Sequence, residues 1–202
     1  MLGGFLYTGG MNIDEMKAIV ADCIANKTAH VFKAVTAEVP SWDEFIAHLD
    51  YEYNHPESQE SNDPNEETMI GGVCLRNNFY MSVRNPEAFG FSHLKEVTDL
   101  FDEVLEEKGY PVSAFVNFVG KEKPIKMHID RRDSVYWQCQ GSALWQISSG
   151  PNAPVIEYRL EPGDVIYVPK HVLHSVVTDT PRTAITMAYK ADPYAVYYMS
   201  DQ

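Results

Sequence analysis

From Pro111 onward, the chain consists of short runs of β-prone residues interrupted by turn residues. The runs are rich in Val, Ile, Phe, Tyr and Trp, and Gly, Pro and Asn separate them at short intervals. This pattern is typical of an antiparallel β-sandwich or barrel, and it limits the possible folds more than any other feature of the sequence. The strands that it predicts are residues 112–119, 125–130, 134–140, 143–148, 155–160, 164–168, 172–178, 183–189 and 194–199.

The first half of the chain carries a helical pattern instead. Apolar side chains recur at helical spacing after Asn12, and Asn12 with Glu15 matches a capping box, so we expect a helix over residues 13–26. The same Ser-x-x-Glu pattern at Ser41 opens a second helix, and residues 92–108 have the pattern of a third. The remaining expected elements are a short strand at 30–35, one or two strands within 73–83 and an exposed loop at 54–68.

Length and charge bound the domain organisation and the class of partner. With 202 residues, 45% of them hydrophobic, the chain is about one domain in size, so we expect a single domain over residues 1–202. Residues 1–110 would supply N-terminal helices, first strands and an acidic loop, and residues 111–202 the β core. The chain has 16 basic and 29 acidic residues, and this net charge of −13 makes nucleic acid an improbable partner.

The acidic excess lies in the first half. Residues 1–110 hold 7 basic and 20 acidic residues, whereas residues 111–202 hold 9 of each. One interpretation is a solvated surface that keeps the protein soluble, and the other is an acidic face that attracts a basic protein partner. The sequence does not indicate an oligomeric state.

The cysteines and the N-terminus bear on location. Cys23, Cys74 and Cys139 are scattered and form no Cys-x-x-Cys pair, which suggests neither a disulfide framework nor a thiolate zinc site. The chain begins without the basic and apolar pattern of a signal peptide, and its apolar runs are too short to span a membrane. We therefore expect a cytoplasmic protein without membrane association.

Three side chains in the β-rich half have the chemistry of a metal site. His128 and Asp130 stand at i and i+2, so an extended strand places both on one face. The distant His174 follows a turn, a strand and a proline. Two histidines and one carboxylate are the set required for the facial triad of non-haem Fe(II) oxygenases, which leaves open positions for a bidentate co-substrate and dioxygen.

These motifs resemble those of a known family. The segment from Gly163 through Pro169 to His174 is similar to the second cupin motif, and His128-x-Asp130 followed by Gly141 is similar to the first motif in the JmjC-type oxygenases that depend on Fe(II) and 2-oxoglutarate. The resemblance implies a double-stranded β-helix core with flanking N-terminal helices. It also implies Fe(II), 2-oxoglutarate as co-substrate and O2, with metal ligands His128, Asp130 and His174.

The resemblance also suggests co-substrate contacts. JmjC hydroxylases commonly hold the distal carboxylate of 2-oxoglutarate with a Lys or Arg at the position that Ala143 occupies here. Arg182 is similar instead to the late-strand Arg of prolyl-hydroxylase-type oxygenases, and an Arg fork suits bidentate carboxylate recognition. Thr186 shares the strand face of Arg182, and Asn117 and Tyr136 resemble pocket-lining positions of related enzymes.

The function that the resemblance implies is hydroxylation of a protein side chain or a small molecule, coupled to conversion of 2-oxoglutarate to succinate. The presence of Asp rather than Glu at position 130 favours hydroxylation within this group. Two alternatives stay open on the residues alone. One is a cupin metalloenzyme that does not use 2-oxoglutarate, either an isomerase or a substrate-only dioxygenase. The other is a cupin-fold binding protein without turnover.

Overall fold

The computed structural model describes residues 11–54, 69–70, 73–76, 80–84, 86–118 and 127–189. Within them, the strands form two antiparallel sheets: eight strands in the order β1-β9-β6-β11-β5-β4-β3-β2, and three in the order β10-β7-β8. The helices are α1 (Ile13–Asn26), α2 (Trp42–Asn54), α3 (Pro86–Phe89) and α4 (Leu94–Leu105). The strands are β1 (His30–Phe32), β2 (Met69–Ile70), β3 (Val73–Arg76), β4 (Tyr80–Arg84), β5 (Tyr110–Asn117), β6 (Asp133–Gln140), β7 (Ala143–Ser148), β8 (Ile156–Leu160), β9 (Val165–Val168), β10 (Leu173–Val177) and β11 (Arg182–Tyr189).

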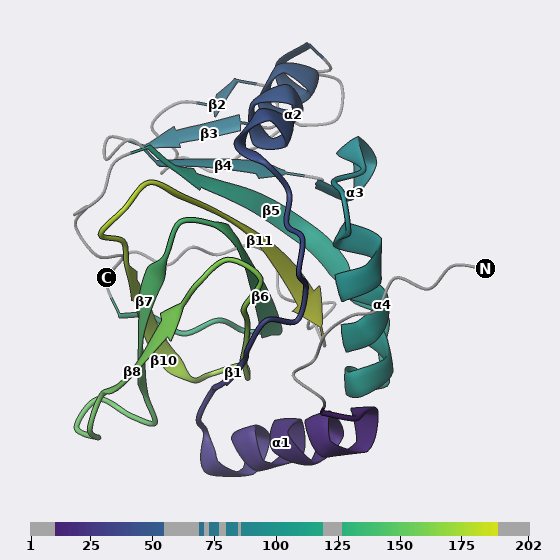
Figure 1. Ribbon diagram of the computed structural model, residues 1–202. Helices are drawn as coiled ribbons and strands as arrows, with labels where there is room; N and C mark the ends of the chain where they lie inside the picture. The colour runs from purple at the N-terminus through teal and green to yellow at the C-terminus, as the bar shows by residue number, and fades with distance from the viewer. Residues whose placement is uncertain are drawn as a thin grey trace.

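The strands of the second half curve around an apolar interior, and α1 and α4 lie outside it (Figure 1). Successive side chains of a strand point to opposite faces, so a central strand of this barrel contributes to two cores. On β6, Tyr136 packs against the inner cluster, whereas Val135 and Trp137 belong to the outer cluster beneath the helices. The buried inner cluster consists of Ala29, Ala143, Trp145, Ile147, Leu160, Ile166, Val168, Val172 and Val176.

Both faces of β11 are covered, and all of its residues are buried. Ile185 and Met187 pack into the outer cluster with Phe101 of α4 and Met16 of α1. Burying each such side chain contributes about 1.5–3 kcal/mol, so this helix-covered face stabilises the strand that carries Arg182.

The predicted fold class is confirmed: the chain is mainly β, with flanking helices and an antiparallel jelly-roll core. The capping box that the sequence predicts at α1 is also confirmed. The Glu15 N–H donates to Oδ1 of Asn12, and the Asn12 N–H donates to Oε2 of Glu15, each over 2.9 Å. Ser41 and Glu44 form the equivalent pair at α2, where the Ser41 N–H donates to Oε2 of Glu44 over 2.8 Å.

Several predicted elements differ from the structure. The strand expected at 30–35 ends at Phe32, because the chain turns at Ala34 with a positive φ of 49°. The third helix is shorter than the expected 92–108 and follows the separate turn of α3. The strand expected at 125–130 is wrong for its described part, where His128 makes only an isolated bridge. The predicted strand at 194–199 and the predicted loop beyond Asn54 lie outside the described residues.

Across the described ranges, none of the helices combines the length and apolarity needed to cross a membrane.

Candidate metal centre and co-substrate pocket

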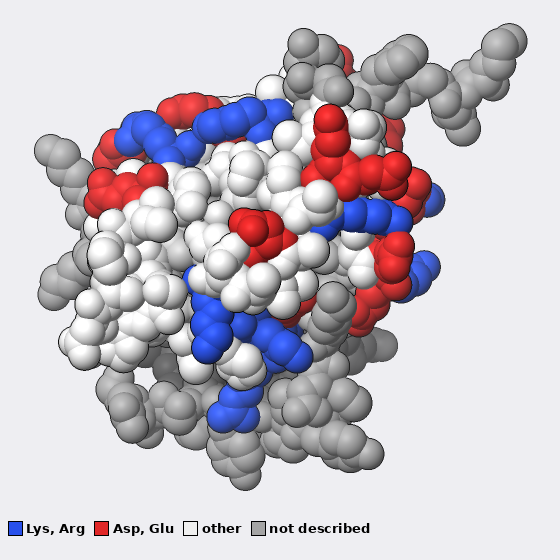
Figure 2. All heavy atoms as spheres, turned by 90° about the horizontal axis from the view of Figure 1, so that it is seen from below, with Lys and Arg blue, Asp and Glu red and all other residues white. Residues whose placement is uncertain are grey.

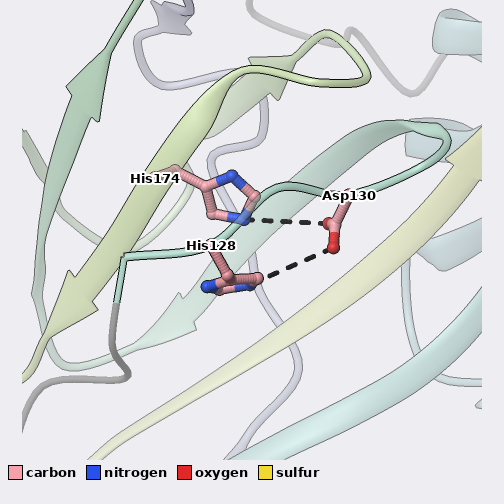
Figure 3. Close-up of side chains that lie close together, drawn as sticks. All are labelled: His128, Asp130 and His174. Atoms are coloured by element: carbon pink, nitrogen blue, oxygen red, sulfur yellow. Dashed lines mark ion pairs between the residues drawn. The ribbon is translucent and has the colours of Figure 1, made fainter. Parts of the chain in front are cut away.

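Two histidines from distant parts of the sequence are joined through their backbones. The His128 N–H donates to the His174 carbonyl over 2.9 Å, and the His174 N–H donates to the His128 carbonyl over 2.8 Å. Their side-chain rings lie with centroids 4.3 Å apart. Figure 3 shows both rings together with the Asp130 carboxylate. The structure therefore brings the three predicted metal ligands together.

The spacing of the ligand atoms suits one metal ion. Oδ1 of Asp130 lies 4.0 Å from Nε2 of His128, and its Oδ2 lies 3.7 Å from Nε2 of His174. One ligand atom from each of the three residues lies within 4.8 Å of the others. Ligand atoms that each lie about 2.0–2.2 Å from a shared ion are roughly 3–4 Å from one another. The two histidines and one carboxylate thus form a compact donor set of mixed nitrogen and oxygen.

His174 is prepared to act as a ligand. Its Nδ1 lies 3.0 Å from the Val172 carbonyl, which can only accept, so Nδ1 donates and Nε2 keeps its lone pair. The ring is buried, and Nε2 has no hydrogen-bond partner among the described residues. Burial lowers the pKa of His174 and so favours the neutral imidazole that binds metals. A buried nitrogen without a partner fits a coordination bond better than a structural role.

The Asp130 carboxylate is held by two hydroxyl groups of β6. The Tyr136 phenol donates to Oδ2 over 3.0 Å, and the Ser134 hydroxyl donates to the same oxygen over 3.3 Å. Burial raises the pKa of Tyr136 well above its usual range, with the Asp130 charge adding to the rise, so the phenol keeps its proton. Tyr136 was singled out as a pocket residue, whereas sequence reasoning missed the contact of Ser134.

The aromatic ring of Trp145 packs against the ligand His174. The buried Trp145 ring stacks on His174 at a centroid distance of 5.7 Å and an interplanar angle of 27°. It also packs against Tyr136 at 4.5 Å. Trp145 fills the inner cluster and also restricts the orientation of His174.

Arg182 lies buried on the first position of β11, directly across the sheet from Asn117 on β5. Its Nε donates to Oδ1 of Asn117 over 2.9 Å, and its Nη1 donates to Oε1 of Gln138 over 3.4 Å. Gln138 is a contact that the sequence pattern did not indicate. The small side chain of Ala143 is fully buried in the inner cluster. The structure therefore brings Arg182 and Asn117 together as expected and adds a third member.

Thr186 completes the row of inward residues. It pairs with Tyr136 across the β6–β11 register, whereas Gln138 pairs with Ala184. The Thr186 hydroxyl is buried and finds no hydrogen-bond partner within the described part of the chain. Tyr136 and Gln138 are two residues apart on one strand face, a separation of about 7 Å. Gln138, which accepts from Arg182, is thus one side-chain repeat away from Tyr136, which holds Asp130.

Comparisons with known proteins give one family match and several similar folds. The family model described as JmjC domain matches residues 148–197, which include His174 and Arg182. No curated protein matches the chain.

Similar solved structures include YcfD, a ribosomal oxygenase from Escherichia coli, with 15% identity, a TM-score of 0.53, and coverage of 92% of this chain and 52% of that chain. The same protein in complex with cobalt and 2-oxoglutarate gives 15% identity and a TM-score of 0.52, covering 87% of this chain and 52% of that chain. Its complex with cobalt and succinic acid gives 16% identity and a TM-score of 0.51, over the same shares.

At such low identity these similarities show a shared fold, and this chain spans about half the length of these YcfD structures. Together with the family match, they confirm the predicted likeness to the JmjC-type oxygenases.

Proposed function

We propose that the chain is a non-haem Fe(II)- and 2-oxoglutarate-dependent oxygenase that hydroxylates a side chain of a protein. The observation that carries the proposal is the convergence of His128, Asp130 and His174, with the buried His174 Nε2 lacking any other described partner. The JmjC family match over residues 148–197 includes His174, and the fold is similar to that of YcfD, which supports the proposal.

His128, Asp130 and His174 would hold the metal. Bound Fe(II), with 2-oxoglutarate and O2, supplies the oxidising power that inserts one oxygen atom into a substrate C–H bond while the other enters succinate as CO2 is released. The residues of the chain have the supporting tasks. Tyr136 fixes the orientation of the Asp130 carboxylate by its hydrogen bond, and the Val172 carbonyl fixes the tautomer of His174.

Arg182 would bind the distal carboxylate of 2-oxoglutarate. Its fork presents several N–H groups in a plane, and in a buried site a charge-assisted bond to a carboxylate is about twice as strong as a neutral one. Asn117 and Gln138 hold the guanidinium in place through its Nε and Nη1. The Thr186 hydroxyl, on the same face of β11, can donate to the same co-substrate.

The two alternatives make different demands on these residues. A cupin enzyme that does not use 2-oxoglutarate needs the metal ligands but not a buried arginine beside them. A binding protein without turnover needs neither an open coordination position nor a co-substrate. The burial of Arg182 on the inner face of the barrel favours the oxygenase.

The decisive experiment measures succinate formed from 2-oxoglutarate by the full chain with Fe(II) in air. Many oxygenases of this kind consume some 2-oxoglutarate without their substrate, so the assay does not depend on knowing it. We expect turnover that is lost in His128→Ala and Asp130→Ala and kept in His30→Ala, a histidine outside the site. Succinate formation that persists in both ligand variants, or full iron binding by both, would overturn the proposal.

The class of substrate is proposed from two observations. YcfD, to which the chain is similar in fold, is a ribosomal oxygenase, which supports a protein target. The two ligands His128 and Asp130 are partly exposed, with side-chain exposures of 41% and 25%, so a large partner can approach them. A small-molecule substrate is the competing outcome, and screening peptides against metabolites for stimulated succinate formation separates the two.

Organisation and location are proposed in the same way. We propose that residues 1–202 act as one domain, because β1 of the first half pairs with β9 of the second.

Cys23 and Cys139 are both free and buried, which fits a reducing, cytoplasmic setting.

A further inference from the structure

A group of basic side chains lies next to the candidate metal centre and has no task in the chemistry above. Arg131 and Arg132 directly follow the ligand Asp130, and Lys170 lies on the segment between β9 and β10. We call Arg131, Arg132 and Lys170 the basic rim. Arg131 and Lys170 are exposed, and Arg132 is half-buried.

Two hydrogen bonds hold the segments of the basic rim side by side. The His171 N–H donates to the Asp130 carbonyl over 2.8 Å, and the Lys170 N–H donates to Oδ1 of Asp133 over 2.9 Å. His171 adopts a positive φ of 64°, which is uncommon outside glycine and is often found at functional sites. The rim is therefore fixed relative to the Asp130 carboxylate by the backbone.

The charges of the basic rim are available to a partner. Several other basic side chains of the described residues pair with acids, among them Lys17 with Glu106, Lys33 with Asp164, and Arg159 with Asp179. By contrast, no acidic side chain in the described part of the chain forms an ion pair with any member of the rim. Figure 2 shows, on the face that it presents, one group of Lys and Arg side chains at the lower centre with few Asp or Glu beside it, whereas other Lys and Arg side chains lie among Asp and Glu.

The basic rim lies next to the candidate ligand set. Arg131 and Arg132 follow Asp130 directly in the chain, and the residue after Lys170 donates its backbone N–H to the Asp130 carbonyl. An anion that docks on the rim would therefore lie close to the reacting centre.

We propose that the basic rim binds an acidic residue of a polypeptide substrate, next to the side chain that is oxidised. This inference rests on the proposed function. It assigns a negative charge to the bound residue of the partner, whereas the net charge of −13 suggests a basic partner. A polypeptide is favoured because the surface around the ligands is open and partly apolar. Met127 and Ile129, which alternate with the ligands His128 and Asp130, are 38% and 48% exposed.

The test uses two labelled peptides of equal length: one of Glu, Ala and Gly, and one in which Lys replaces every Glu. Fluorescence anisotropy measures the binding of each to the full chain loaded with Co(II) and 2-oxoglutarate at low salt. We expect the acidic peptide to bind and the basic peptide not to bind. Arg132→Glu and Lys170→Glu should each raise the Kd of the acidic peptide by roughly tenfold or more.

Lys108→Glu is the matched control, because it makes the same change of charge on an exposed lysine outside the rim, and its Kd should stay within about twofold of the parent. Tighter binding of the basic peptide, or equal Kd values for the rim variants and Lys108→Glu, would overturn the inference. Displacement of the peptide by free glutamate at equal carboxylate concentration would show that the rim does not select a polypeptide.

The same binding assay without metal and co-substrate, compared with the succinate assay of the full chain with Fe(II), separates the two proposals. If the chain binds the acidic peptide through the rim but does not form succinate, the proposed function fails and the rim stands as a binding surface for acidic peptides. If it forms succinate but shows no preference for the acidic peptide, the inference about the rim fails and the function stands.

Discussion

His128 and His174, 46 positions apart in the sequence, form a cross-strand pair in which each backbone N–H donates to the carbonyl of the other. The pair is an isolated bridge, flanked by no further ladder. Two backbone hydrogen bonds therefore set the distance between the two candidate ligands, whose rings lie with centroids 4.3 Å apart. This contact closes the barrel at the point where the chemistry is proposed to occur.

The hydrogen bond between Tyr136 and Asp130 should matter for metal binding. We expect Tyr136→Phe to weaken the affinity for Co(II) by roughly 10–100-fold, because the carboxylate loses the hydroxyl that orients it. Calorimetric titration of the full chain measures this affinity. Tyr167→Phe is a matched control, since it also removes one buried phenol hydrogen bond, to Asp133, outside the ligand set. Equal Co(II) affinities in the two variants would contradict the prediction.

Arg182→Lys keeps the positive charge but removes the planar fork. We expect the Kd for 2-oxoglutarate to rise by roughly tenfold or more, because a lysine cannot form two parallel bonds to a carboxylate. The variant should also lose about 1–3 kcal/mol of unfolding free energy, since Asn117 and Gln138 lose their donor. Co(II) affinity in the absence of 2-oxoglutarate should be unchanged. If 2-oxoglutarate binds the variant as tightly as the parent, Arg182 does not hold its carboxylate.

Gly141 lies at a crowded turn beside Arg182. Its φ is +65°, and a Cβ there would lie 2.1 Å from the Pro181 carbonyl oxygen. We expect Gly141→Ala to cost about 1–3 kcal/mol or more of unfolding free energy, from strain and from displacement of the start of β11. Gly150→Ala is the control, because nothing lies within 4 Å of its Cβ position. Urea unfolding that gives the same midpoint for both variants would show that the turn can relax.

His93 predicts a dependence of stability on pH. Its Nδ1 lies 2.6 Å from Oε2 of Glu96 and its Nε2 lies 3.1 Å from Oε2 of Glu38, and these contacts, the bond to Glu96 first, raise its pKa above 6.5. Because the pKa of His93 is higher in the folded state, protonated His93 stabilises the fold. This stabilisation is fully present below the unfolded-state pKa of about 6.5 and is lost as pH rises through the folded-state pKa. We expect His93→Gln to be less stable than the parent at pH 5.5, with the difference shrinking toward pH 8.5. Urea unfolding at several pH values checks this, and a difference that is constant with pH would refute it.

Local sequence patterns were sufficient for many elements. The capping box of Asn12 and Glu15 marks the start of α1, and apolar spacing marks α4, because both signals depend on neighbours within one or two turns. Alternating β-prone runs identified most strands of the barrel for the same reason. The residue types of the triad were evident too, since few side chains coordinate metals.

The sequence did not reveal which groups meet across the barrel. The β-prone residues around Ile129 suggested a strand, yet the chain there makes a single bridge, because its neighbours bond to the loop before β10 instead. Gln138 at Arg182 and Ser134 at Asp130 carried no signal, since polar residues on a strand usually face water. Nor could spacing show that Lys170 lies beside the segment after Asp130.

The sequence by itself thus determined the β-rich class, the helix starts and the chemistry of the candidate ligands. Only the tertiary structure decided that His128 bridges His174, that Arg182 is buried between Asn117 and Gln138, and that Lys170 lies beside the segment that follows Asp130. The physical reason is the range of the interactions. Propensity and capping act between residues close in sequence, whereas register, burial and the local field depend on segments that only the folded barrel brings together.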